Sequence, residues 1–171
     1  SDYYNSIISP FYSYSTGRTK ETLRSSQVTC RDIDDDGYIE IPEDTSSKKQ
    51  SSEITSQNWV NYGNTVLSHK CYSFSCKRDG YILVIDDDDF SKVKANYDSE
   101  SRKLTIINKK NKSNVFEIVT LINSNYSVND PKYKDYTMIM KNSGFVYLAK
   151  VNKSSDIDIN IQTLKDMIKV Y

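Results

Sequence analysis

Short apolar and aromatic runs, separated by polar turns, occupy most of the chain after residue 50. The runs are rich in Val, Ile, Tyr and Phe, and the turns contain Gly, Asn, Asp or Ser, which is the pattern of antiparallel strands joined in series. The dipeptide Asp79-Gly80 and the segment 141–144 (Lys-Asn-Ser-Gly) are typical hairpin turns. The pattern predicts strands over residues 59–62, 65–74, 81–85, 92–97, 103–108, 115–122, 136–140 and 145–151.

Near the C-terminus the apolar residues change from alternation to helical spacing. They recur every three to four positions, and lysines lie opposite them and near the chain end, where the helix dipole favours cations. The apolar stripe consists of Ile161, Leu164, Met167, Ile168 and Tyr171. We expect a terminal amphipathic helix that packs on the sheet of its own domain. The predicted fold class is therefore α+β, mainly an antiparallel sheet with this helix packed on it.

The first 50 residues follow a different pattern. Residues 1–20 carry aromatic side chains among Ser, Thr and Gly without a period of 2 or 3.6, which indicates an arm or a broken strand pair. β-Favouring residues then lie on both sides of an acidic loop and predict a strand-loop-strand unit. The polar segment 43–56 has no apolar face and predicts a flexible boundary near residue 50. We therefore expect an N-terminal part over residues 1–50 and an antiparallel α+β domain over residues 51–171.

Composition and charge narrow the class of protein. Lys and Arg together number 23, as do Asp and Glu, so the formal net charge is zero and no basic excess favours nucleic acid or an anionic membrane. No apolar run approaches the roughly 20 residues that span a bilayer. The chain begins at Ser1 without a hydrophobic leader, so we expect a processed chain or a fragment whose export signal lies upstream.

The segment 32–40 (Asp-Ile-Asp-Asp-Asp-Gly-Tyr-Ile-Glu) carries the strongest chemical signal. Calcium takes about six to eight oxygen ligands, which carboxylates on alternate residues of a tight loop can supply while a glycine permits the sharp turn. The predicted metal ligands are the side chains of Asp32, Asp34, Asp36 and Glu40 and the main-chain carbonyl of Tyr38, with Glu43 in reserve. The alternative is a solvated acidic turn in which the Asp side chains only cap local amides.

The residues flanking this loop decide between two calcium motifs. The string from Asp32 to Glu43 also satisfies the EF-hand pattern. An EF-hand needs a helix after the loop, whereas Pro42 biases Ile41 away from the α region and removes an amide where that helix would start. Because the residues before the loop are strand-like as well, we expect a calcium turn between two strands, closed by Glu40.

The other reactive side chains form no recognised signature. Three cysteines, Cys30, Cys71 and Cys76, are an odd set that cannot all pair within one chain. His69 lies close to Cys71, but the spacing fits neither a four-ligand zinc pattern nor a Cys/His catalytic signature. The acidic run 86–89 has consecutive carboxylates and no glycine, which predicts a helix start or a solvated loop.

Residues 22–26 (Thr-Leu-Arg-Ser-Ser) and 30–42 (Cys-Arg-Asp-Ile-Asp-Asp-Asp-Gly-Tyr-Ile-Glu-Ile-Pro) resemble a segment of exported lipoproteins from Gram-positive, Clostridia-type gut bacteria that carry VCBS or FG-GAP propeller repeats. In such repeats a D-x-D-x-D-G-x-x-D/E loop holds calcium between strands, which implies the same ligand set here. The loop commonly has Gly where this chain has Asp35. The remainder, including residues 80–84 and 161–171, is similar to the module that follows such repeats and implies a PsbP-like sheet with helices.

These observations give one leading functional hypothesis and two alternatives. The leading one is a non-catalytic extracellular module of a lipid-anchored cell-surface protein, with one structural calcium ion. We expect it to be monomeric, to bind a protein or glycan or to join domains, and to insert no segment into the membrane. The first alternative is a hydrolase that uses Cys71 with His69, or a carboxylate pair. The second, a calcium sensor, would need paired EF-hands and is the least favoured.

Overall fold

A computed structural model describes residues 26, 28–45, 53–63, 66–127, 130–152 and 157–171 of the chain. The chain divides into two compact units, residues 1–45 with 57–70, and residues 46–56 with 71–171. Each unit combines segments that are distant in sequence. The divisions fall inside strands β2 (Ile54–Gly63) and β3 (Val66–Cys76), so each of these strands belongs partly to one unit and partly to the other. The predicted N-terminal arm and the predicted boundary near residue 50 lie outside the described residues.

The first unit is built on the N-terminal half of β3 and the strands beside it. Strand β1 (Ile41–Asp44) pairs antiparallel with β2, so that Pro42 lies opposite Trp59 and Glu43 opposite Asn58. Strand β2 is hydrogen-bonded in turn to β3. Because β1 is the edge strand among the strands described, its proline removes no amide that another of them would need. Trp59 is fully buried and anchors this unit.

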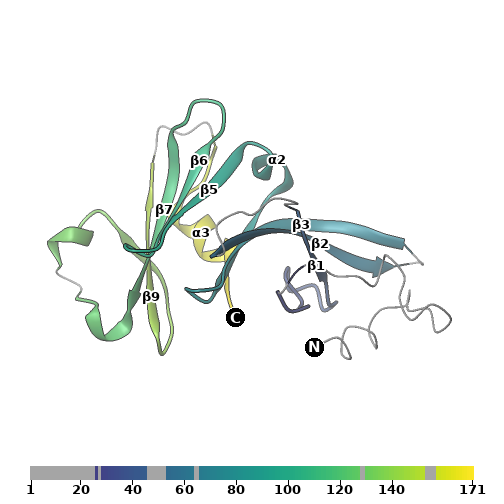
Figure 1. Cartoon of the computed structure of the whole chain (residues 1–171), viewed down its shortest axis with the longest axis horizontal. Helices are drawn as coiled ribbons and strands as arrows, with labels where there is room; N and C mark the ends of the chain where they lie inside the picture. The colour runs from purple at the N-terminus through teal and green to yellow at the C-terminus, as the bar shows by residue number, and fades with distance from the viewer. Residues whose placement is uncertain (1–25, 27, 46–52, 64–65, 128–129, 153–156) are drawn as a thin grey trace. The chain divides into compact units, whose positions relative to one another are not determined.

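The second unit contains a five-stranded antiparallel sheet and a smaller group of strands (Figure 1). The five-stranded sheet has the order β5-β6-β7-β9-β8. Its strands are β5 (Val93–Asp98), β6 (Lys103–Asn108), β7 (Asn114–Ile122), β8 (Thr137–Lys141) and β9 (Phe145–Val151). In the smaller group, β4 (Tyr81–Ile85) pairs antiparallel with β3 on one side and with β10 (Ile168–Val170) on the other.

The turns and short helices of this unit follow local sequence chemistry. Gly80 has a φ of +72°, which a glycine adopts at no steric cost, and it ends the turn between β3 and β4. The acidic run after β4 starts the single-turn helix α2 (Asp87–Phe90), which is one of the two alternatives that the sequence left open. Two 3₁₀ turns, η2 (Asn123–Asn125) and η3 (Pro131–Tyr133), lie between β7 and β8. The predicted hairpins β3/β4 and β8/β9 are confirmed, and the strands predicted over residues 92–97 and 103–108 pair with each other as β5 and β6.

The C-terminal helix is shorter than the apolar stripe predicts. Helix α3 (Ile161–Met167) is capped by Asn160, whose side chain accepts hydrogen bonds from the amides of Gln162 and Thr163. Its buried residue Leu164 belongs to the core. It packs against β8 and β9 and against β4 and β10. Ile168 is not helical, because residues 168–170 pair with the open edge of β4 instead. The last turn of the expected helix is therefore replaced by a strand that satisfies that edge.

The core of the second unit lies among these strands and α3. Its largest fully buried side chains include Tyr81, Phe116 and Tyr147, together with Leu83, Ile106 and Ile118 from the strand centres. The rings of Tyr81 and Tyr147 meet edge to face, with their centroids 5.5 Å apart. Mostly antiparallel sheet with a short C-terminal helix is thus the architecture, and it agrees with the β-rich part of the sequence prediction.

Candidate metal centre

A two-residue bridge closes the acidic loop at its base. The Glu40 amide donates to the Arg31 carbonyl at 2.9 Å, and the Arg31 amide donates to the Glu40 carbonyl at 3.2 Å. Strand β1 begins at the next residue, so the chain leaves the loop in extended conformation and the helix of an EF-hand is absent, as Pro42 predicts. The prediction of a strand before the loop is wrong for its described residues, 26 and 28–30, which form no strand; pairing there starts with the bridge at Arg31.

Inside the loop, carboxylates hold the main-chain amides. Asp32 accepts hydrogen bonds from the amides of Asp36 at 3.0 Å and Gly37 at 2.8 Å. Asp36 in turn accepts from the Tyr38 amide at 2.9 Å. The chain reverses through two residues of positive φ, Asp35 at +60° and Gly37 at +91°. Asp tolerates the left-handed region better than most residues, which explains how the loop forms with Asp35 in place of glycine.

Four carboxylates converge on one point in this loop. One ligand oxygen from each of Asp32, Asp34, Asp36 and Glu40 lies within 4.8 Å of all the others. Oxygens that surround one calcium ion at about 2.3 to 2.6 Å can be separated by at most about 4.6 to 5.2 Å. The spacing of the four oxygens therefore fits a single ion of this size.

Glu40 differs from the other three because it is buried. Its side chain has no exposed surface, Oε2 accepts a hydrogen bond from the Ile33 amide at 3.0 Å, and Oε1 has no hydrogen-bond partner within the described part of the chain. Burial, and then the negative charges of Asp34, Asp36 and Asp32, raise the pKa of this carboxyl. A buried acceptor without a donor costs folding free energy, so this oxygen points to a ligand that satisfies it.

The two other predicted ligands have different surroundings. The Tyr38 side chain is 69% exposed, in keeping with a residue expected to contribute only its main-chain carbonyl. Glu43 lies within β1 and outside the cluster, where its carboxylate accepts a hydrogen bond at 3.3 Å from the side-chain amide of Asn58. The structure thus brings Glu40, and not Glu43, to the three aspartates.

Sequence reasoning missed one residue of the site, Lys70. Its ammonium lies 2.5 Å from Asp36 Oδ2 and 3.2 Å from Asp34 Oδ2. The hydrogen bond to Asp36, and then the one to Asp34, raise the pKa of Lys70, and the same lysine lowers the pKa of Asp36. Lys70 lies on β3, 34 positions from Asp36 along the chain, so only the pairing of the strands could have revealed it.

The cysteine and histidine candidates lie along β3 or before the loop. The His69 ring is exposed, and its Nδ1 lies 2.5 Å from the side-chain oxygen of Asn58. Cys30 and Cys71 are half-buried, whereas Cys76 is fully buried. Burial and the neighbouring Asp79 carboxylate raise the pKa of the Cys76 thiol to about 12, which makes it a poor nucleophile at neutral pH.

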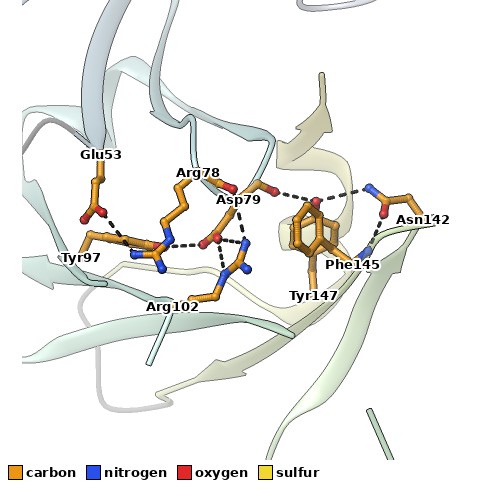
Figure 2. A network of polar contacts seen from close by, with 8 residues as sticks. All are labelled: Glu53, Arg78, Asp79, Tyr97, Arg102, Asn142, Phe145 and Tyr147. Atoms are coloured by element: carbon orange, nitrogen blue, oxygen red, sulfur yellow. Dashed lines mark hydrogen bonds and ion pairs between the residues drawn. The ribbon is translucent and has the colours of Figure 1, made fainter. Parts of the chain in front are cut away.

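A second polar cluster, in the other unit, centres on the fully buried Asp79 (Figure 2). Arg102 binds Asp79 Oδ1 through Nε at 2.7 Å and Nη2 at 2.6 Å, and the Tyr97 hydroxyl donates to Oδ2 at 2.8 Å. The Tyr147 hydroxyl donates to the Asp79 main-chain carbonyl at 2.8 Å. The sequence indicated only a turn at Asp79 and gave no sign of this buried pair.

The Asp79 cluster is fully satisfied and links separate turns of the fold. The guanidinium of Arg102 also lies over the Phe145 ring, 4.7 Å from its centroid, and the phenol of Tyr147 receives a hydrogen bond from Asn142 at 3.4 Å (Figure 2). The cluster therefore connects the β3/β4 turn to the β5/β6 turn and to β9. Both Asp79 oxygens are engaged within the protein, which is typical of a structural ion pair.

Comparisons with models of known protein families, with curated proteins and with solved structures find no match for this chain. Among the described residues, no helix is both long and apolar enough to cross a membrane.

Proposed function

We propose that this chain is a non-catalytic, extracellular module in which the loop of residues 32–40 binds one calcium ion with a structural role. The observation that carries the proposal is Glu40 Oε1, a fully buried carboxylate oxygen that has no donor among the described residues and belongs to a cluster of four convergent carboxylates. A cation at the centre of the cluster would satisfy this oxygen and offset the mutual repulsion of the four groups.

The chemistry of the donor set supports calcium over other metals. The four donors are all carboxylates, with no imidazole or thiolate among them, and zinc prefers nitrogen and sulfur ligands. Magnesium demands a near-ideal octahedron and keeps several of its waters, whereas calcium accepts flexible, carboxylate-rich loops with more ligands. The carbonyl of Tyr38 and water would complete the calcium shell.

The partly exposed position of the loop supports a site of modest affinity. Asp34 and Asp36 are exposed, so water competes with them for the ion, and the loop loses conformational entropy when it orders around the ion. Extracellular calcium modules bind with dissociation constants of about 0.1 to 1 mM, which suits the calcium level outside cells. This is the physical support for an extracellular location, together with the resemblance of the loop to those of lipid-anchored surface proteins.

In this function the ion acts on the fold. Bound calcium would hold the loop against the start of β1 and so stabilise the first unit, where Trp59 is buried opposite Pro42. The module would then present a surface to a protein or glycan at the cell surface, or join neighbouring domains, as a monomer. No step of chemistry is assigned to it.

A thermal melt with and without calcium tests the proposal. We expect excess calcium to raise the melting temperature and a chelator to reverse the change, because an ion that binds only the folded state stabilises it by mass action. Magnesium at the same concentration is the control and should give a much smaller increase. Calorimetric titration should show one site. No heat of binding and no thermal shift at 10 mM calcium, about tenfold above the weakest expected dissociation constant, would contradict the proposal.

A further inference from the structure

Lys70 lies against two of the four carboxylates that would hold a calcium ion. Its ammonium makes ion pairs with Oδ2 of both Asp34 and Asp36, two of the four convergent carboxylates. The lysine and the loop belong to the same compact unit. A protein-borne cation therefore already neutralises part of the site.

The other contacts of Asp36 make this arrangement competitive. Asp36 Oδ1 accepts the hydrogen bond of the Tyr38 amide, which holds the turn, so Oδ2 is the oxygen best placed to ligate an ion. That same atom is the one closest to Lys70, at 2.5 Å. An ammonium and a divalent cation on one carboxylate oxygen repel each other, so the two cations cannot share this position.

Glu40 shows that the lysine does not complete the site. Lys70 has contacts with Asp34 and Asp36, whereas the buried Glu40 Oε1 has no donor within the described residues. The ammonium thus pairs with the two exposed carboxylates, Asp34 and Asp36, and leaves the buried Glu40 for a ligand. A calcium ion would bind the exposed carboxylates and Glu40 together.

We infer that Lys70 is a tethered counter-cation that holds the loop in its metal-free form and that calcium must displace. This inference rests on the calcium site proposed above and adds how that site is regulated. In the metal-free protein, Lys70 limits repulsion among the carboxylates and keeps the loop folded. On calcium binding its ammonium swings into solvent, which weakens the measured affinity and raises the calcium concentration at which the site fills.

The effect on affinity can be estimated from the two ion pairs. Each exposed pair of this kind changes an equilibrium constant by about 1.5-fold to fivefold. Removal of the ammonium should therefore tighten calcium binding by about twofold to 25-fold. Substitution by arginine keeps the charge, so its affinity should stay within about threefold of the wild type.

Calorimetric titration of calcium into the wild-type chain, Lys70→Gln and Lys70→Arg tests the inference. The matched control is Lys94→Gln, an exposed lysine of β5 whose loss changes the net charge equally. We expect tighter binding for Lys70→Gln than for Lys94→Gln, and circular dichroism should confirm that all variants are folded. As a second readout, acetylation of Lys70 in the unmodified protein, followed by peptide mass spectrometry, should become faster when calcium is added, while acetylation of Lys94 stays constant.

The outcomes separate this inference from the calcium function. If the wild type binds calcium but Lys70→Gln binds no tighter than Lys94→Gln, or if calcium leaves the acetylation rate of Lys70 unchanged, the counter-cation role is wrong and the calcium site stands. If only Lys70→Gln binds calcium, the lysine blocks the site, and the inference is supported in its strongest form. If no variant binds calcium, the proposed function itself fails, and the counter-cation role fails with it.

Discussion

Replacement of Glu40 by glutamine should separate the two consequences of its burial. In the metal-free protein the carboxylate is fully buried and Oε1 has no donor within the part of the chain that the structure describes, so its charge destabilises the fold. In the calcium-bound protein the same oxygen would belong to the fully buried member of the four carboxylates. Glu40→Gln should therefore stabilise the metal-free protein and weaken its response to calcium.

The magnitude follows from the contacts of this side chain. A buried acceptor that lacks a donor costs about 1 to 3 kcal/mol. Glutamine keeps the shape and can still accept the Ile33 amide through its carbonyl, while its amide hydrogens can donate to the neighbouring aspartates. The free energy of unfolding without metal should rise by about 1 to 3 kcal/mol, or about 2 to 4 °C in melting temperature for each kcal/mol in a chain of this size.

The assay is a pair of thermal melts at pH 7, one with chelator and one with excess calcium. For the wild type, calcium at 100 times its dissociation constant should add about 2.7 kcal/mol. For Glu40→Gln the affinity should fall about tenfold or more, because ligand charge sets the strength of such sites. Glu43→Gln is the matched control, since Glu43 lies outside the cluster and should leave both melts unchanged.

Two results would refute this reasoning. A lower melting temperature of Glu40→Gln in chelator would mean that the charge of Glu40 stabilises the metal-free loop. A calcium response equal to that of the wild type would mean that Glu40 is not a ligand. Loss of the calcium response in Glu43→Gln would instead assign the closing position to the residue held in reserve.

Two further predictions concern the second unit. Arg102→Met should lower the free energy of unfolding in urea by about 3 to 5 kcal/mol, because it leaves the buried Asp79 charged and without its partner, and adding Asp79→Asn should recover part of this loss. Alkaline pH should also destabilise this unit. The pKa of Cys76 rises from its ordinary 9.0 to about 12 in the folded protein. The neutral thiol therefore contributes fully to the free energy of unfolding below about pH 9, and this contribution is lost as the pH rises towards 12. Cys76→Ala should flatten the decline of urea stability over this range, and an unchanged slope would contradict the assignment.

Much of the candidate site could be predicted from a single stretch of sequence. The three aspartates and Glu40 are near neighbours in the chain, and the alternation of carboxylates with a glycine is enough to bring them together. Pro42 was sufficient to exclude an EF-hand, and β1 follows the loop as expected. The burial of Glu40 could not be predicted in this way, because burial depends on how the chain packs in three dimensions and not on the spacing of residues within the loop.

The C-terminal segment shows where local periodicity fails. Residues 161–171 have helical spacing throughout, yet only Ile161–Met167 is helical, and Ile168–Val170 pairs with β4. Seven residues are too few for a helix to be stable by itself, so the tertiary contacts of this segment decide its end. If residues 168–170 formed one more helical turn, the hydrogen-bonding groups on this edge of β4 would lose the partners that β10 gives them.

The sequence alone determined the turns, most of the strands and the loop with its convergent aspartates, because these depend on side-chain chemistry and backbone preference within a few residues. Only the tertiary structure decided which distant side chains meet, namely Lys70 with the acidic loop and Arg102 with Asp79. The physical reason is that such pairs are set by strand register and chain packing. Neither strand register nor chain packing produces a periodic sequence pattern at the residues that form the pair.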